Sequence, residues 1–183
     1  GSGAWSHPSI GKYIPYARDL NLMLHCHVPI SDPLWVEQIE EAIKSQVVPL
    51  KYDKNLIGYY LDNELDWETL SPYADKYFST ICALVRKYDP NHLILGVRFN
   101  KRPPPQVLLA SSGKVDVHSV HVYSDDAQAY KHMVRDLWTL GNAPIIVSEF
   151  TFYSLDNDSG NLNIKGWGGN QINRYERARA SRN

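Results

Sequence analysis

Short apolar runs alternate with amphipathic segments along this chain. The runs are rich in β-branched and aromatic residues, which is typical of buried strands. They predict strands at residues 20–26, 56–61, 93–99, 115–123 and 143–150. Between the runs, apolar residues recur every three or four positions, which is the period of a helix with one buried face. These segments predict helices within residues 31–48, 71–90, 103–113 and 125–141.

Two of the helices carry start signals. Asp32-Pro33 and Ser71-Pro72 each place a capping side chain before a proline, which is favoured in the first helical turn. The expected apolar faces are Trp35, Ile39, Ala42, Ile43 and Val47 in the first helix and Tyr77, Ile81, Leu84, Val85 and Tyr88 in the second. A Gly- and Asn-rich loop over residues 156–170 precedes an Arg-rich segment that begins like a helix.

Alternation of strands and helices without hairpin turns predicts an α/β fold with a parallel sheet. A doubly wound sheet and a (β/α)8 TIM barrel both fit, but no Gly-x-Gly-x-x-Gly motif follows a strand to support the first. A barrel of about 250 residues uses about 31 residues in each βα unit, so 183 residues correspond to about six units. We therefore expect residues 1–183 to form a single, incomplete barrel domain.

Composition narrows the class of protein. The chain is 43% hydrophobic and 21% charged with a formal net charge of -1, so nothing indicates nucleic-acid binding. No apolar run is long enough to cross a membrane, and the beginning shows no signal-peptide pattern. Cys26 and Cys82 are expected to be buried free thiols, although one disulfide stays open. His25-Cys26-His27 and the pair His118 and His121 lack zinc-site spacing, so we expect no metal and no cofactor.

Polar side chains follow the predicted strands at their carboxyl ends. Asn63 and Glu64 follow the strand at 56–61, Arg98 lies near the end of the strand at 93–99, and Glu149 lies near the end of the strand at 143–150. His121 and Tyr123 end the strand at 115–123. Active sites of barrels are built at this edge of the sheet. Two glutamates next to buried strands indicate a functional or ion-paired role. Burying a carboxylate costs free energy unless the group is paired with another charge or takes part in function.

The spacing of the glutamates suggests their chemistry. Glu149 lies 85 residues after Glu64, which is close to the length of three βα units at about 31 residues each. The two carboxylates are therefore expected to face each other across the mouth of a barrel. Such a pair is what glycoside hydrolysis needs: one protonates the leaving oxygen, and the other attacks the anomeric carbon or activates water.

These motifs resemble a known group of enzymes. "DNE" after one strand and "SEF" after a later strand are similar to the retaining (β/α)8 glycosidases, whose acid/base follows an Asn on strand 4 and whose nucleophile ends strand 7. "IGYYLDNELDW", "VSEFTFYSLDN" and "GWGGNQINRYERARA" most resemble the β-agarases of glycoside hydrolase family 50, and the family 42 β-galactosidases are more distant. The resemblance covers about strand 2 to the start of helix 7.

The resemblance implies roles for individual residues. Glu64 becomes the acid/base, Glu149 the nucleophile, and Asn63 the ligand of the sugar 2-hydroxyl. His121 and Tyr123 flank the sugar and the nucleophile, while Arg98 is either a further substrate-binding residue or a structural ion-pair partner of Glu149. Asp62 and Asp66 are expected to be scaffolding. Trp5, Trp67 and Trp167 are candidates to stack on sugar rings, although Trp5 and Trp67 suit core packing equally well.

We therefore expect a retaining β-glycosidase that cleaves a galactose-containing polysaccharide, like a β-agarase. A catalytically silent carbohydrate-binding barrel stays open, as does a β-galactosidase or β-mannanase of the same clan. The expected partner is a polysaccharide or oligosaccharide, with neither nucleic acid nor membrane, and the oligomeric state is open. A polysaccharide substrate favours a secreted or periplasmic protein over a cytoplasmic one.

Overall fold

The computed structural model describes residues 7–123, 127–150, 153–156, 170–171, 173–180 and 182. Its strands are β1 (Tyr16–Asp19), β2 (Leu56–Tyr60), β3 (Leu93–Ile94), β4 (Arg98–Phe99), β5 (His118–Val122), β6 (Ile145–Phe150), β7 (Tyr153–Ser154) and β8 (Asn170–Gln171). Its α-helices are α1 (Trp35–Val47), α2 (Trp67–Leu70), α3 (Ala74–Tyr88), α4 (Pro105–Ser111), α5 (Ala127–Gly141) and α6 (Arg174–Ala180). Four 3-10 helices among these residues are η1 (Pro8–Lys12), η2 (Leu22–His25), η3 (Val48–Leu50) and η4 (Ser71–Tyr73).

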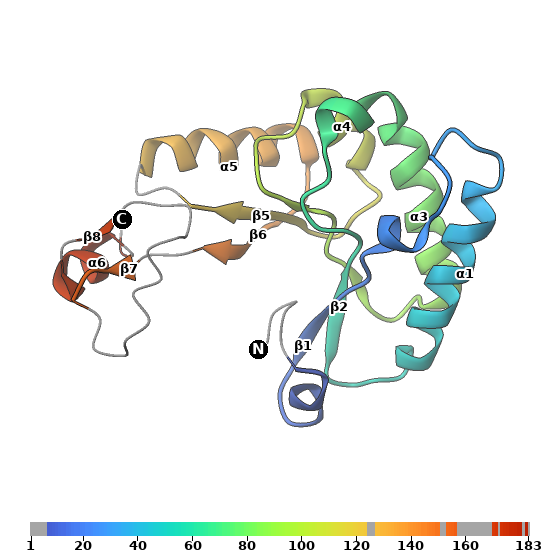
Figure 1. The fold of residues 1–183 in the computed structure, drawn as a ribbon, viewed down its shortest axis with the longest axis horizontal. Helices are drawn as coiled ribbons and strands as arrows, with labels where there is room; N and C mark the ends of the chain where they lie inside the picture. Colours follow the sequence, from blue (N-terminus) through green and yellow to red (C-terminus); the bar gives the residue numbers. More distant parts are fainter. Residues whose placement is uncertain are drawn as a thin grey trace.

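The described strands form parallel sheets, as the alternating pattern predicts. One sheet has the order β1-β2-β3 and a second has the order β4-β5-β6, and every pairing within them is parallel. A further pairing between Asn63 and Arg98 carries the first sheet into the second. The strands therefore follow one another in space in their order along the chain (Figure 1).

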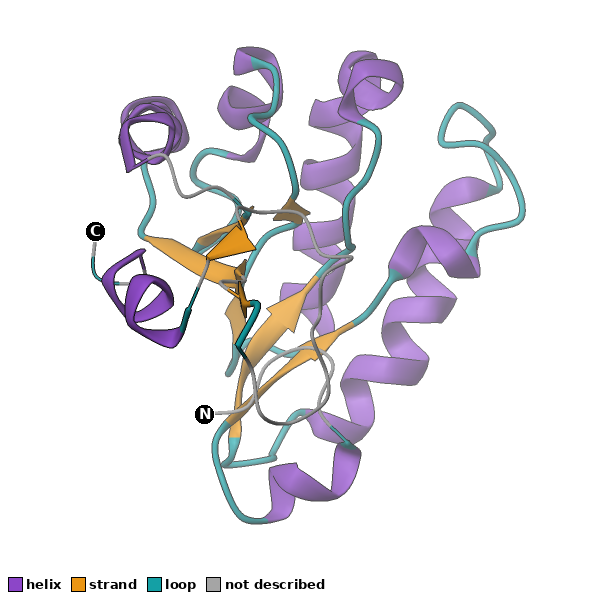
Figure 2. Ribbon diagram, turned by 60° about the vertical axis from the view of Figure 1, so that its left-hand side comes forward, coloured by secondary structure: helices purple, strands orange, loops and turns teal. Residues whose placement is uncertain are grey.

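The helices that connect the strands lie on one side of them. Helices α1, α3, α4 and α5 each contact the next, and Figure 2 shows this row of helices flanking the strands. The core fills the space between the two layers, with Trp35 and Ile39 from α1 and Phe78 and Ile81 from α3 fully buried. Full burial of one large apolar side chain stabilises a fold by about 1.5–3 kcal/mol, so this layer is the main source of stability.

The predicted apolar faces are confirmed, but the first strand is not where the sequence pattern places it. Residues 20–26 are expected to be extended, whereas β1 ends at Asp19 and η2 occupies Leu22–His25. Asn21 adopts the left-handed conformation with φ 48°, which turns the chain out of the sheet. The buried Asp62 carboxylate then accepts a hydrogen bond from the Met23 N–H at 2.9 Å and holds the turn.

Residues 93–99 also differ from the prediction, because they form two short strands. Gly96, with φ 70°, separates β3 from β4. Its carbonyl accepts a hydrogen bond from the Leu61 N–H at 2.9 Å, and an added Cβ would lie 2.9 Å from the Val117 carbonyl oxygen. Both the positive φ and the close approach require glycine here.

The helix after β2 begins earlier than Ser71. Asp66 caps α2: its carboxylate accepts from the Glu68 N–H at 3.1 Å and from the Thr69 hydroxyl at 2.7 Å. The chain continues through η4 into α3. Among the described residues both cysteines are free, and no helix is long and apolar enough to span a bilayer.

Candidate active site at the carboxyl ends of the strands

The polar residues predicted to form the site come together at adjacent strand ends. Asn63 and Glu64 follow β2, and Asn63 pairs with Arg98 of β4. On β5 and β6, His121 stands opposite Glu149. The tertiary structure therefore gathers into one cluster side chains that come from four strands.

Arg98 is the centre of this cluster. Its side chain is 1% exposed, with one Nη donating to Asn63 Oδ1 at 2.7 Å and the other to Glu149 Oε2 at 2.7 Å. The guanidinium also lies 3.7 Å from Asp19 Oδ2 and 5.5 Å from the centre of the Tyr60 ring. The planar fork of an arginine can hold two partners in fixed directions, which fixes the Glu149 carboxylate and the Asn63 amide together.

Tyr123 provides a second donor to Glu149. Its hydroxyl donates to Glu149 Oε1. Burial, and then this hydrogen bond to an anion, raise the pKa of Tyr123, so the phenol keeps its proton and remains a donor. Glu149 therefore faces a guanidinium on one oxygen and a phenol on the other, and both favour its ionised form.

His121 lies between the two glutamates. Its buried ring places Nδ1 2.7 Å from Glu64 Oε1 and Nε2 3.8 Å from Glu149 Oε2. Burial lowers the pKa of His121, against the opposing pull of the hydrogen bond to Glu64, so the ring is neutral near pH 7. A neutral imidazole has one donor nitrogen and one acceptor nitrogen. The ring can therefore donate a hydrogen bond to only one of the two carboxyl groups, and towards the other it can only accept.

Glu64 is placed by a strained backbone. Its φ of 51° lies in the left-handed region, which costs a residue other than glycine about 1 kcal/mol or more. The Glu64 N–H donates to the Arg98 carbonyl at 3.0 Å, which holds this conformation. The side chains of Glu64 and Glu149 are 36% and 35% exposed, so both carboxylates are open to a ligand on one side and ordered on the other.

Asp19 belongs to the cluster, although the sequence pattern does not identify it. It ends β1, is buried, and faces Arg98. Burial raises the pKa of Asp19, with the Arg98 charge acting in the opposite direction. The available signal in "YARDL" is weak, because the charged Arg18 separates Asp19 from Tyr16 and Ala17, and the apolar run predicts the strand at residues 20–26, beyond Asp19.

Asp62 and Trp67 are both buried. The Tyr77 hydroxyl donates to Asp62 Oδ2 at 2.6 Å, and this carboxylate also holds Met23. Trp67 is 6% exposed and its ring stacks on Phe78 with centroids 5.5 Å apart, so it packs in the core rather than offering an exposed stacking surface. Trp5 and Trp167 lie outside the described residues.

A hollow of about 190 Å³ adjoins Glu64. It lies between the segment that follows β2 and the segment that follows β4. Its lining residues are Glu64, Leu65, Asp66, Trp67 and Glu68 from the first segment, Phe99 at the end of β4, and Asn100, Lys101, Arg102, Pro103 and Pro104 from the second segment. The hollow gives a ligand that contacts Glu64 room to extend over the surface.

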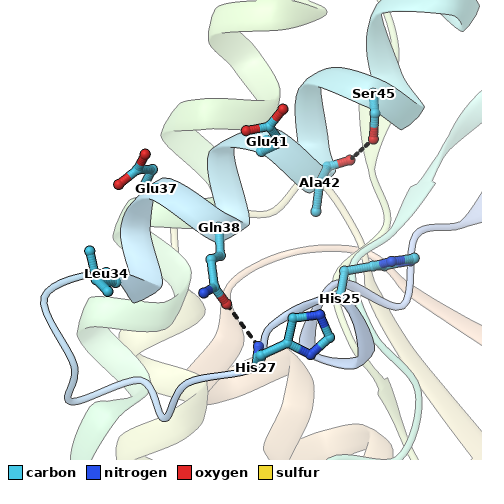
Figure 3. Close-up of a pocket in the computed structure, with 8 residues that line it drawn as sticks. All are labelled: His25, His27, Leu34, Glu37, Gln38, Glu41, Ala42 and Ser45. Atoms are coloured by element: carbon cyan, nitrogen blue, oxygen red, sulfur yellow. Dashed lines mark hydrogen bonds between the residues drawn. The ribbon is translucent and has the colours of Figure 1, made fainter.

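A second hollow, of about 480 Å³, lies beside α1 and is lined by His25 and His27, for which the sequence predicts no metal (Figure 3). Gln38 accepts from the His27 N–H at 2.8 Å, while Glu37 and Glu41 point away from both His25 and His27. Within the described parts of the chain, no three His, Cys, Asp or Glu residues lie together in a way that could hold a metal ion.

Fold and site together define an α/β protein with two glutamates at the carboxyl ends of parallel strands. No protein-family model matches the chain. Its sequence is similar to that of beta-agarase A from Vibrio sp. (strain JT0107), with 33% identity over 107 residues. That match covers 56% of this chain and 11% of the agarase.

Two solved structures share the fold. One is the crystal structure of an agarase, AgWH50C. The match covers 98% of this chain and 36% of the agarase chain, with a TM-score of 0.72 and 20% sequence identity. The other is the structure of an exo-beta-agarase. The match covers 98% of this chain and 36% of that chain, with a TM-score of 0.73 and 17% sequence identity. At these identities the likeness establishes the fold alone, and this chain spans about a third of each solved structure.

Proposed function

We propose that this chain carries the active site of a glycoside hydrolase that cleaves an agarose-type galactan with retention of configuration. We also propose that its parallel strands are consecutive strands of a (β/α)8 barrel. The unreversed strand order and the single row of helices support the barrel. Strand β6 exposes three apolar side chains, those of Ile146, Val147 and Phe150. In a barrel, a neighbouring βα unit would cover such side chains.

The unequal surroundings of the two glutamates carry the functional proposal. Glu149 accepts hydrogen bonds from Arg98 and Tyr123, which suits a nucleophile that must stay ionised. Glu64 meets only the neutral His121 ring among the side-chain contacts described above, and it borders a hollow. Two carboxyl groups held in different environments are the mark of an acid and a nucleophile.

The reaction follows from these roles. The Glu149 carboxylate attacks the anomeric carbon while Glu64 gives its proton to the leaving glycosidic oxygen, so the glycosidic C–O bond breaks as the ester bond forms. Glu64, now ionised, takes a proton from water, and the resulting hydroxide attacks the same carbon and releases Glu149. The hollow beside Glu64 accommodates the leaving sugar, since the acid must reach the leaving oxygen.

Asn63 is the proposed ligand of the sugar 2-hydroxyl. Arg98 donates to Asn63 Oδ1 at 2.7 Å, which fixes the orientation of the amide. The Nδ2 group is then the end of the side chain that can donate to a sugar oxygen. Such contacts strengthen in the transition state of glycoside hydrolysis.

The choice of an agarose-type substrate comes from the relatives reported above, which are called agarases. A screen of agarose, porphyran, galactan, mannan and cellulose with product analysis tests it, and we expect cleavage of agarose. Proton NMR of the first product reports the anomeric configuration. An inverted product contradicts the double displacement, and cleavage of mannan or cellulose instead of agarose contradicts the substrate.

Amide variants test the two roles. Glu149→Gln and Glu64→Gln are expected to lower kcat by about 10²–10⁴-fold or more on a substrate with a poor leaving group. Glu37→Gln makes the same change on the exposed surface of α1 and serves as the matched control. Retained sugar binding in Glu149→Gln with hydrolysis lost supports the enzyme. An unmodified protein that binds agarose oligosaccharides and cleaves none of the five polymers contradicts it.

A further inference from the structure

His121 has a geometry that the roles above do not use. Its Nδ1 makes a short 2.7 Å hydrogen bond to Glu64, whereas Nε2 lies 3.8 Å from Glu149 and has no hydrogen-bond partner in the described part of the chain. One buried ring therefore contacts both carboxyl groups through opposite nitrogens. Because a neutral imidazole carries a single ring proton, the position of that proton on one side determines what the other side can do.

We propose that His121 is a positioning residue that couples the charge of Glu149 to the proton of Glu64. An ionised Glu149 holds the ring proton on Nε2, and the unprotonated Nδ1 then accepts a hydrogen bond from a protonated Glu64. The inference rests on the proposed function, in which Glu64 must enter the reaction as an acid and Glu149 as an anion.

The charges around the ring support this arrangement. The carboxyl groups of Asp19 and Glu149 face the Arg98 guanidinium at 3.7 Å and 2.7 Å, whereas the Glu64 carboxyl group meets the His121 ring. The Tyr123 ring packs edge-on against His121 with centroids 6.0 Å apart. Carboxyl groups at close range influence one another's charge, so a ring that contacts two of them can transmit a change at one to the other. Arg98 and Tyr123 both donate to Glu149, whereas the Glu64 carboxyl group meets the His121 ring, so the ring is the group through which the charge of Glu149 can act on Glu64.

The arrangement has a chemical consequence. When Glu149 loses its negative charge, as it does on forming an ester, the electrostatic attraction that favours the ring proton on Nε2 is lost. A ring with its proton on Nδ1 would instead donate to an ionised Glu64. The same side chain thus favours a protonated Glu64 while the nucleophile is free and an ionised Glu64 while the nucleophile is occupied, which are the states that the two displacements require.

The test reads the ring proton directly and needs no substrate. Two-bond ¹⁵N–¹H correlation spectra of the histidine-labelled protein near neutral pH report which nitrogen of the assigned His121 ring carries the proton. We expect Nε2–H in the unmodified protein. In Glu149→Gln, which removes the charge, we expect the population to move towards Nδ1–H. In Glu64→Gln, whose amide can donate to Nδ1, we expect Nε2–H to persist.

Asp19→Asn is the matched control, because it makes a similar change from carboxyl group to amide in the same cluster, and Asp19 does not contact the ring in the described hydrogen bonds. We expect the ring proton to stay on Nε2 in this variant. A ring that carries its proton on Nδ1 in the unmodified protein overturns the coupling. So does a tautomer that is the same in Glu149→Gln, or one that Asp19→Asn changes as much as Glu149→Gln does.

These outcomes separate the inference from the proposed function. A protein that cleaves no galactan but shows the tautomer change contradicts the proposed function and supports the coupling. A protein that cleaves agarose with its His121 proton on Nδ1 supports the function and overturns the coupling.

Discussion

Asp62, which precedes Asn63 of the candidate site in the chain, allows a test of how burial of a carboxyl group affects the pH dependence of stability. Its carboxyl group is 2% exposed and accepts hydrogen bonds from the Tyr77 hydroxyl and the Met23 N–H. Burial is the largest influence and raises the pKa of Asp62 to about 7, although both hydrogen bonds act to lower it. The folded protein therefore binds this proton more tightly than the unfolded chain does, so the protonated carboxyl group favours folding.

The sign and size follow from linkage. A carboxyl group whose folded pKa is raised contributes most to stability below its unfolded pKa, and that contribution is lost as pH rises through the folded pKa. For Asp62, a rise from the model-peptide value of 3.8 to about 7 corresponds to roughly 4 kcal/mol between about pH 4 and pH 7. Asp62→Asn keeps the size and shape of the side chain but cannot ionise. The variant should therefore not lose stability through ionisation at this position as the pH rises.

The measurement is the free energy of unfolding in urea at several pH values between about 4 and 7.5 for the unmodified protein and Asp62→Asn. We expect the variant to gain stability relative to the unmodified protein as pH rises. Asp66→Asn is the contrast: the hydrogen bond from Thr69 lowers the pKa of the exposed Asp66, so its contribution is lost as pH falls. Parallel profiles for the unmodified protein and Asp62→Asn refute the burial argument.

Two further changes test the site and the sheet. Arg98→Lys replaces a fork that reaches both Asn63 and Glu149 by a single ammonium, so kcat for galactan hydrolysis should fall by about 10²–10³-fold, and an unchanged kcat would contradict the positioning role. Gly58→Ala would drive a Cβ into the Leu93 carbonyl oxygen of the β2–β3 pair, so calorimetry should show a Tm lowered by several degrees, about 1–3 kcal/mol. Gly113→Ala, which meets nothing within 4 Å, isolates the cost of positive φ and should lower Tm less.

The elements with a strong period are predictable from sequence. The predicted apolar face of α1, from Trp35 to Val47, is buried because an apolar stripe on a helix is stabilised by packing against a core. Strands β2, β5 and β6 fall within the predicted runs for a similar reason, since β-branched and aromatic runs suit strands between two layers. The break at Gly96 is not predictable, because it depends on how closely the chain of Val117 approaches.

The order of residues along the chain identifies most of the candidate site. Parallel strands bring their carboxyl ends to one edge, so the sequence alone assigns Glu64, Arg98, His121 and Glu149 to a common region. The division of roles among the acidic residues is only partly readable from it. Asp62 and Asp66 are expected to be scaffolding, and the structure shows one holding a buried turn and the other capping a helix.

What only the tertiary structure decides is which groups face each other. Asp19 meets Arg98, Trp67 enters the core, and one imidazole contacts both glutamates. The physical reason is the range of each effect. Periodicity and strand-end position are properties of neighbours along the chain, whereas the surroundings of a carboxylate depend on dipoles and charges a few ångströms away on other strands.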